Sequence, residues 1–318
     1  MSARSDGPRI GWIGAGRMGA ALAGRLVAAG HDVAVYNRTR AKAEAVGNGR
    51  VTVVDSPADL ADRDVVFTMV SASADFEQVV LGDGGLLSGS AAPRVLVDSS
   101  TVSTESSRRV REAAAARGTT LLAAPVSGNP SVVAAGKLTM AVSGPHEAYE
   151  QARPLLELLG QGVTFVGEGE EARLVKICHN VFLGVVTQSL AEITLLAQQG
   201  GTSRAAFLSF LNDSVMGSTF TRYKTPALVD LDFTPTFTNP LLLKDFDLGL
   251  DAGKQLGVPM PVAALAAQLV ASAVGAGHDK QDFATLILEQ ARRSGVELAP
   301  EDAAVSDGLA PEPADGED

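Results

Sequence analysis

The chain has 318 residues, of which 46% are hydrophobic, 20% charged and 5% aromatic. This composition is typical of a globular protein of about two domains, and it excludes wholesale disorder. The formal net charge is −11, and eight acidic residues with no Lys or Arg among them lie between Glu297 and the end of the chain. Nothing here resembles the clustered basic surface that nucleic acids require, so we expect no nucleic-acid partner.

The cysteine content and the distribution of apolar residues bear on three questions: whether the protein has disulfides, whether it binds a metal, and whether it is secreted or inserted in a membrane. Cys178 is the single cysteine, which excludes an intramolecular disulfide, and no Cys/His cluster has the spacing of metal ligands. The first residues lack the apolar run of a signal peptide, and no segment has the roughly 18 uninterrupted apolar residues of a membrane span. We therefore expect a cytoplasmic protein with no metal site and no membrane partner.

The first 165 residues alternate short β-rich runs with Ala-rich helical patterns. The expected strands are 9–13, 32–36, 51–54, 65–69, 94–97, 119–123, 137–142 and 163–166. Expected helices between them include 17–29, 103–117 and 146–159. Apolar strands separated by helices of this length predict an α/β fold with a doubly wound, mostly parallel sheet of the Rossmann type, covered on both faces.

After residue 167 the strand signals stop and helical patterns take over. One long helix is expected over Glu170–Gln199, ended by two glycines, and shorter helices at 203–212, 240–256, 259–275 and 282–294. The stretch around Arg222 and Lys224 is expected to be irregular. We predict an α/β domain over 1–167, an all-helical C-terminal domain over 168–296, and an acidic disordered tail over 297–318.

A glycine-rich turn joins the first expected strand to the first expected helix. Its sequence is GAGRMG, residues 14–19, and its position between strand and helix is typical of a dinucleotide site. Gly14 would permit the tight turn, Gly16 would let the main chain approach a pyrophosphate, and Gly19 would allow close helix–strand packing. With Arg17 and Met18, these glycines form the predicted cofactor-binding turn.

The residues after the second expected strand bear on the choice of cofactor. An acidic residue there would bind the ribose 2′-hydroxyl of NAD, but this chain has Asn37, Arg38 and Thr39 instead. Arg38 can hold a 2′-phosphate through charge-assisted hydrogen bonds, and the other two add neutral donors. We predict NADP in preference to NAD; the alternative is that Arg38 is a solvated residue at a helix start.

Further polar segments follow other strands or lie on the later helices. DSST at residues 98–101 and APVSGN at 124–129 each follow an expected strand, and the second precedes GKLT at 136–139. Lys176 and Asn180 are four residues apart on the long helix and so share one face. The pair Lys244-Asp245 lies in a later helix.

With these motifs in order over residues 9–290, the chain resembles the β-hydroxyacid dehydrogenase family, which includes 3-hydroxyisobutyrate dehydrogenase and has a 6-phosphogluconate dehydrogenase-like cofactor domain. The motifs that carry the resemblance are GWIGAGRMG, APVSGN with AAGKLT, KICHN and KDF. The resemblance implies NADP- or NAD-dependent interconversion of a small 3-hydroxy acid and its semialdehyde. It also implies a homodimer or homotetramer assembled through the helical domain.

The resemblance also implies roles for individual residues. Lys176 would be the catalytic acid/base, and Asn180 would help to place it and the substrate. The substrate carboxylate would be held by Ser127, Gly128 and Asn129. The cofactor would be contacted by four further residues, of which the third also touches the substrate: Met69, Val70, Thr101 and Lys244.

The residues support this chemistry independently. Hydride transfer to a carbonyl leaves charge on oxygen and therefore needs a proton donor, which a lysine on a largely apolar helix face can supply. Two alternatives stay open: an imine or iminium reductase on a similar scaffold, against which Lys176 argues, and a non-catalytic cofactor-binding protein. Departures from the family pattern, at Ala123, Asn129 and Ala172, put the identity of the substrate in doubt.

Overall fold

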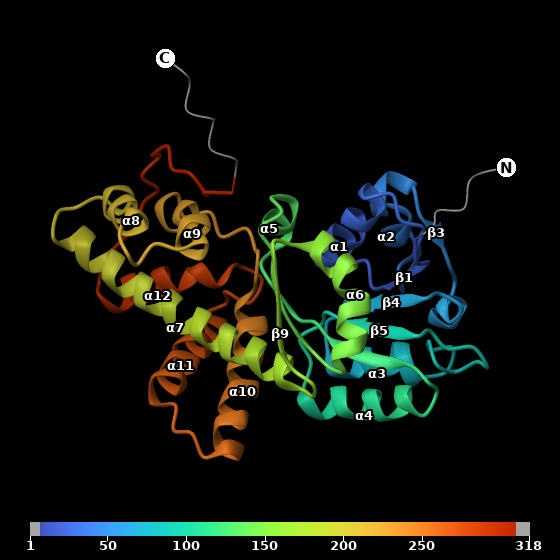
Figure 1. Cartoon of the computed structure of the whole chain (residues 1–318). Helices are drawn as coiled ribbons and strands as arrows, with labels where there is room; N and C mark the ends of the chain where they lie inside the picture. Colours follow the sequence, from blue (N-terminus) through green and yellow to red (C-terminus); the bar gives the residue numbers. More distant parts are fainter. Residues whose placement is uncertain (1–6, 310–318) are drawn as a thin grey trace. The chain divides into compact units, whose positions relative to one another are not determined.

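One nine-stranded sheet lies in the N-terminal unit of the computed structural model, which describes residues 7–309 and is shown in Figure 1. This unit ends at Lys176, and a second unit begins at Ile177. The strands are β1 (Ile10–Ile13), β2 (Val33–Tyr36), β3 (Thr52–Val53), β4 (Val65–Thr68), β5 (Val95–Asp98), β6 (Thr120–Ala123), β7 (Val126–Ser127), β8 (Thr139–Ser143) and β9 (Gly162–Gly167).

The strand order is β3-β2-β1-β4-β5-β6-β8-β7, with β9 paired to β8. Neighbouring strands from β3 to β6 are parallel, whereas β8 runs antiparallel to both β6 and β7. The chain adds β2 and β3 on one side of β1 and then returns to add β4 on the other side. In sheets of this kind, ligands bind at the carboxyl ends of the strands where the order reverses, here β1 and β4.

Helices cover both faces of this sheet. They are α1 (Arg17–Ala28), α2 (Arg40–Glu44), α3 (Ser73–Leu81), α4 (Thr104–Ala115), α5 (Pro130–Ala134) and α6 (His146–Leu159). Successive residues of a strand point to opposite faces, so Trp12 packs with α1 and α6 while Ile13 packs with α3 and α4. Trp12 and Phe67 stack with ring centroids 5.2 Å apart. The predicted Rossmann-type sheet is confirmed.

The second unit is helical, as predicted. It contains most of α7 (Glu171–Gln199), then α8 (Arg204–Asp213), α9 (Thr219–Val229), α10 (Asn239–Leu256), α11 (Pro261–Gly275) and α12 (Leu286–Arg293), the last preceded by a 3₁₀ turn at Phe283–Thr285. Helices α7 and α10 approach closely through glycines. A Cβ on Gly184 would lie 2.4 Å from the Phe246 ring, and a Cβ on Gly249 would lie 2.4 Å from Val181.

The prediction of an irregular stretch around Arg222 and Lys224 is wrong, because this segment forms α9. Its Thr, Phe and Tyr residues have low helix propensity and Pro226 lies inside the helix, which hides the helical pattern. A capping box between Ser218 and Thr221 starts the helix. Lys224 is buried and lies 2.5 Å from Asp282, and burial lowers the pKa of this lysine.

The tail is ordered for longer than the sequence predicts. Glu301 accepts the main-chain N–H groups of Arg204 and Ala205, at 2.8 and 2.9 Å, and so caps the first turn of α8. Leu309 is buried. Over residues 297–309 the prediction of a disordered tail is therefore wrong, because one carboxylate and a few aliphatic side chains dock this segment. Residues 310–318 lie outside the described part of the chain.

Within residues 7–309, α7 is the one helix whose length and composition would allow it to cross a bilayer, with a mean hydropathy of 1.4. Half of its most apolar window is buried inside the protein. A core helix has the same properties, so this is weak evidence for a membrane span.

Candidate functional site

Two of the three glycines in the glycine-rich turn occupy positions where a side chain would collide with main chain. Gly14 has φ +100°, and a Cβ there would lie 2.2 Å from the carbonyl oxygen of Met69. A Cβ on Gly19 would lie 1.9 Å from the carbonyl oxygen of Gly14. At Gly16, by contrast, a Cβ would meet no described atom within 4 Å, so the main chain borders open space there.

Helix α1 begins directly after this turn and presents its first amides at the carboxyl edge of the sheet. Gly16 is the N-cap residue, and no described side chain caps the first turn. The first N–H groups of a helix lack partners within it and favour an anion such as a pyrophosphate. The turn therefore fits a dinucleotide at the point where the sequence predicts one, with Arg17 and Met18 in the first turn.

Asn37 has a structural role that the sequence did not indicate. Its Oδ1 accepts the N–H of Ala15 at 2.8 Å, and its Nδ2 donates to the carbonyl oxygen of Thr39 at 2.9 Å. Both ends of the amide thus bind main chain and link the two turns. Arg38 is exposed, whereas Arg40 lies 3.0 Å from Glu44 and also pairs with Asp55. Arg38 therefore differs from Arg40, whose side chain is held by carboxylates.

The loops after β4 and β5 are joined by hydrogen bonds. The N–H of Val70 donates to Oγ of Ser100 at 2.9 Å, and this hydroxyl donates to Oδ1 of Asp98 at 2.7 Å. Asp98 is fully buried. The predicted cofactor-binding residues Met69, Val70 and Thr101 thus belong to two loops that the structure holds together at the carboxyl edge of the sheet.

The predicted carboxylate-binding residues lie between β7 and α5. Gly128 has φ +140°, and a Cβ there would lie 2.8 Å from the side chain of Val132. Asn129 is 8% exposed, and its Oδ1 accepts the N–H of Val132 at 3.0 Å, which caps α5. The Ser127 hydroxyl, the Gly128 N–H and the Asn129 amide nitrogen are the donors that this segment supplies.

Lys176 and Asn180 lie one turn apart on α7. Lys176 is half-buried and Asn180 is buried. Nδ2 of Asn180 donates to Oδ2 of Asp245 at 2.5 Å, and Nδ1 of His179 lies 2.9 Å from its Oδ1. Both ends of the Asn180 amide are therefore held, so its orientation is defined.

Asp245 joins two residues that the sequence predicted separately. It is 1% exposed, and Nζ of Lys244 lies 3.3 Å from its Oδ1, the oxygen that does not bind Asn180. The sequence analysis gave Asp245 no role beyond its place in the KDF motif. Its position beside Lys244 in an otherwise amphipathic helix could have indicated a buried carboxylate near the predicted site. Within residues 7–309 no group of three His, Cys, Asp or Glu side chains is arranged to hold a metal ion.

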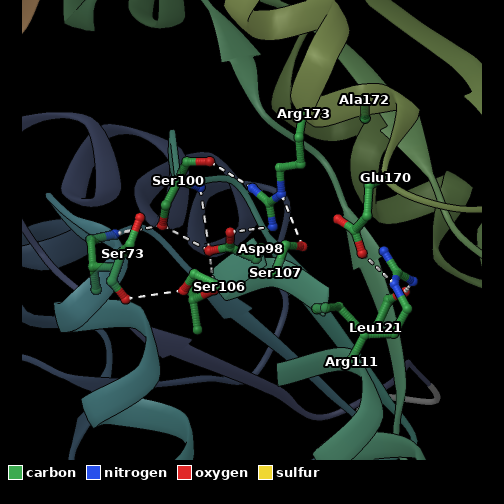
Figure 2. Close-up of polar contacts among 12 residues, drawn as sticks. Ser73, Asp98, Ser100, Ser106, Ser107, Arg111, Leu121, Glu170, Ala172 and Arg173 are labelled. Carbon is green, nitrogen blue, oxygen red and sulfur yellow. Dashed lines mark hydrogen bonds and ion pairs between the residues drawn. The ribbon is translucent and has the colours of Figure 1, made fainter. Parts of the chain in front are cut away.

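Figure 2 shows a second buried carboxylate contact that the sequence analysis missed. Nη2 of Arg173, in the first turn of α7, lies 2.6 Å from Oδ2 of Asp98. The side chains are 1% and 0% exposed. The available sequence signal was the acidic end of the apolar strand VLVD, but nothing in the sequence indicates which cation would meet it.

Two family models match this chain. Residues 9–167 match the NAD-binding domain of 6-phosphogluconate dehydrogenase, and residues 170–289 match a model described as NAD-binding of NADP-dependent 3-hydroxyisobutyrate dehydrogenase. Together these models cover most of the N-terminal unit and the second unit as far as residue 289.

Characterised relatives align over nearly their whole length. The chain is 32% identical to 3-hydroxyisobutyrate dehydrogenase of Pseudomonas aeruginosa, covering 87% of this chain and 96% of that protein. It is 31% identical to 2-(hydroxymethyl)glutarate dehydrogenase of Eubacterium barkeri, covering 92% and 97%. Among solved structures, 3-hydroxyisobutyrate dehydrogenase of Mycobacterium tuberculosis with L-serine has a TM-score of 0.76 at 29% identity, covering 89% of this chain and 99% of that chain.

The turn geometry predicts the effect of a single methyl group on nucleotide binding. In Gly14→Ala, the Cβ would collide with the Met69 carbonyl at a positive φ that costs alanine about 1–3 kcal/mol. We expect NADP and NAD affinities to fall by at least about tenfold, measured by isothermal titration calorimetry.

Gly24→Ala is the matched control, because Gly24 lies inside α1 with no described atom near its Cβ position. That change should raise stability by about 0.5–1 kcal/mol and leave affinity unchanged. A folded Gly14→Ala protein with wild-type affinity would contradict this account of the turn.

Proposed function

Because the chain belongs to the 3-hydroxyisobutyrate dehydrogenase family of NAD(P)-dependent oxidoreductases, we propose that it oxidises the hydroxymethyl group of a small 3-hydroxy acid to an aldehyde, reversibly and with NADP. The observation that carries the proposal is the pair Lys176 and Asn180, one turn apart on α7, with Asn180 held by buried Asp245. A base and a fixed amide on one helix face suit proton transfer to and from an alcohol oxygen.

The relatives suggest the substrate class. 3-Hydroxyisobutyrate, 2-(hydroxymethyl)glutarate and L-serine, the compounds in their names and titles, share the unit HOCH₂–CHR–COO⁻ and differ only in R. We infer that this chain acts on an acid of the same form. Its carboxylate would be held by the hydroxyl of Ser127, the N–H of Gly128 and the amide nitrogen of Asn129, because a carboxylate requires donors.

Asn129 is the residue through which this chain would differ from relatives with glycine at that position. Its side chain is bound to α5 through Oδ1, so it cannot swing away from the carboxylate-binding segment without uncapping that helix. A fixed side chain there narrows the space around the substrate carboxylate and adds an amide donor to it.

Proton transfer is assigned to Lys176. When bound, the dinucleotide supplies the hydride acceptor or donor. In the oxidative direction, Nζ of Lys176 would take the proton of the substrate hydroxyl as the carbonyl forms, and in reduction it would return that proton to the carbonyl oxygen. Asn180, with its amide held by Asp245 and His179, would orient the same oxygen.

Replacing the base tests this assignment. In Lys176→Ala, we expect kcat to fall by about 10²–10⁴, because the change removes the proposed proton donor and acceptor, while nucleotide affinity stays close to wild type. Steady-state assays on 3-hydroxyisobutyrate, 2-(hydroxymethyl)glutarate and L-serine measure the first quantity. Quenching of Trp12, the single tryptophan, measures the second, because its Nε1 binds the carbonyl oxygen of Gly14 at 2.9 Å.

The control is Lys254→Ala, which removes an exposed lysine from the last turn of α10. Its kcat should equal that of wild type. If wild type binds nucleotide but converts none of these acids or their semialdehydes, and instead reduces cyclic imines, the proposed chemistry is wrong while the fold assignment stands.

We propose NADP as the preferred cofactor because Arg38 is exposed after β2 and no acidic residue lies beside it at that strand end. In Arg38→Leu, NADP affinity should fall by about 10–100-fold with little change for NAD, since a charge-assisted hydrogen bond contributes about 1.5–3 kcal/mol. Calorimetric titration with both cofactors measures this ratio. Arg40→Leu is the control, because Arg40 pairs with Glu44 and Asp55; an equal loss for both cofactors would count against the assignment.

We also propose that the protein is a homo-oligomer built from dimers through the helical unit. In the second unit, one face of α7 exposes three large apolar side chains, Phe182 at 68%, Ile193 at 40% and Leu196 at 73%. Spacings of 11 and 14 residues place them on one helix face. A face of this kind is typical of an interface between copies of a chain.

Leu196→Glu should therefore reduce the molar mass in solution to that of the monomer, because it places a charge in the apolar contact. Light scattering coupled to size-exclusion chromatography measures this. Leu256→Glu is the matched control, since Leu256 is 64% exposed at the end of a different helix, α10. A wild-type protein that is monomeric at micromolar concentration would refute the proposal.

A further inference from the structure

Arg173, a buried arginine in the first turn of α7, contacts three separate groups in the N-terminal unit. Its guanidinium donates from Nη1 to the carbonyl oxygen of Ser100 at 2.7 Å and from Nε to Oγ of Ser107 at 3.2 Å. Nη2 lies 2.6 Å from Oδ2 of Asp98 (Figure 2). One side chain thus links α7 to the end of β5, to the loop that follows it and to α4.

Asp98 extends this contact to the neighbouring strand. Its Oδ1 accepts the hydroxyl of Thr68, the last residue of β4, at 2.5 Å, and that of Ser100 at 2.7 Å. Oγ of Ser100 in turn accepts the N–H of Val70 at 2.9 Å. The ion pair and these hydrogen bonds together connect α7 to the loop after β4.

This network joins three of the segments that carry predicted site residues in the N-terminal unit: Val70 after β4, Thr101 after β5, and Lys176 one turn along α7 from Arg173. A misplacement of about 1 Å can cost a catalytic group about 10²-fold in rate. We propose that Arg173 is a positioning residue, which holds the first turn of α7, and with it Lys176, in register with the two loops. Its kinetic consequence rests on the proposed function; the structural link does not.

Stability alone does not explain why a charged pair is used here. Desolvating a guanidinium and a carboxylate offsets most of their attraction, and apolar residues of the same volume often stabilise a core as well or better. A planar guanidinium, however, gives directional contacts to several acceptors at once. The burial of Arg173 and Asp98, at 1% and 0% exposed, therefore favours a role in fixing the relative positions of the segments that they join.

Arg111 shows that tethering the start of α7 does not require this ion pair. Its Nε lies 2.6 Å from Oε1 of Glu170, and it donates to the carbonyl oxygens of Leu121 and Gly169 at 2.6 and 3.0 Å (Figure 2). None of these described partners belongs to the loops after β4 or β5. What Arg173 adds is the connection to those loops.

The test compares Arg173→Lys with Arg204→Lys in the full chain. Lysine keeps the charge, but its single ammonium group cannot reproduce the planar contacts with Asp98, Ser100 and Ser107. Arg204 is also 1% exposed, and its guanidinium binds the carbonyl oxygens of Leu228 and Val229 in the other unit. It therefore controls for the loss of a buried arginine as such.

Amide hydrogen exchange measures the structural link without any activity. We expect exchange at Val70 and Ser100 to accelerate by at least about tenfold in Arg173→Lys and to remain unchanged in Arg204→Lys, because local opening governs exchange. Unchanged exchange at both amides in Arg173→Lys overturns the proposal, even if the wild type proves to have a different activity.

Kinetics measure the consequence for the reaction. In Arg173→Lys, we expect kcat to fall by about 10–100-fold, with nucleotide Kd and substrate KM within about threefold of wild type. The deuterium isotope effect on kcat should rise, because hydride transfer becomes more rate-limiting. A destabilised protein without this defect would show a lower melting temperature and an unchanged isotope effect. If Arg173→Lys shows this pattern, and Arg204→Lys shows the same one, the proposal is overturned.

Should Arg173→Lys fail to fold, Ser107→Ala replaces it, because it removes the acceptor of Nε and leaves the ion pair in place. We then expect a smaller fall in kcat, about 3–10-fold, with faster exchange at Ser100. Wild-type values of both quantities overturn the proposal. A wild type that turns over none of the hydroxy acids refutes the proposed function alone, since the exchange result still decides the role of Arg173.

Discussion

The N-terminal unit depends on a contact between main-chain segments that leaves no room for a side chain. The turn after β1 lies against the end of β4, so that a Cβ on Gly14 would meet the Met69 carbonyl, and the first turn of α1 lies against Gly14 itself. This contact determines where the helix amides point and where the loop after β4 begins. The hydrogen bonds from Val70 to Ser100 and on to Asp98 continue from that loop. The glycine-rich turn and the start of α7 are thus connected through one short stretch of main chain and the hydrogen bonds that continue from it.

The features that the sequence predicted are those determined by residues close to one another in the chain. The glycine turn is recognisable because strand, turn and helix follow one another directly, and the alternation of apolar runs with helical patterns predicts the doubly wound sheet. Lys176 and Asn180 could be paired because helical periodicity places residues four apart on one face. The family matches confirm this fold, while the assigned roles of these side chains remain predictions.

The parts that were missed depend on contacts between residues far apart in the sequence. Asn180 and Asp245 are 65 residues apart, and Arg173 lies 73 residues from Ser100. A buried ion pair leaves no periodic pattern, since each partner is one charged residue in an apolar surrounding. Composition also misled us at the tail, where the acidic stretch predicted disorder but the carboxylate of Glu301 caps α8. Here two specific hydrogen bonds from main-chain N–H groups hold a segment whose overall composition is typical of disorder.

Helix α7 is continuous from Glu171 to Gln199, and both predicted catalytic residues lie on it. Each residue of an α-helix turns the next by about 100°, so one inserted or deleted residue between Lys176 and Asn180 would rotate one away from the other by more than a quarter turn. Substitutions in this segment leave the phase of the helix intact, but changes of length do not. The relative orientation of these two side chains is therefore preserved by any substitution between them and lost with any change in the number of residues.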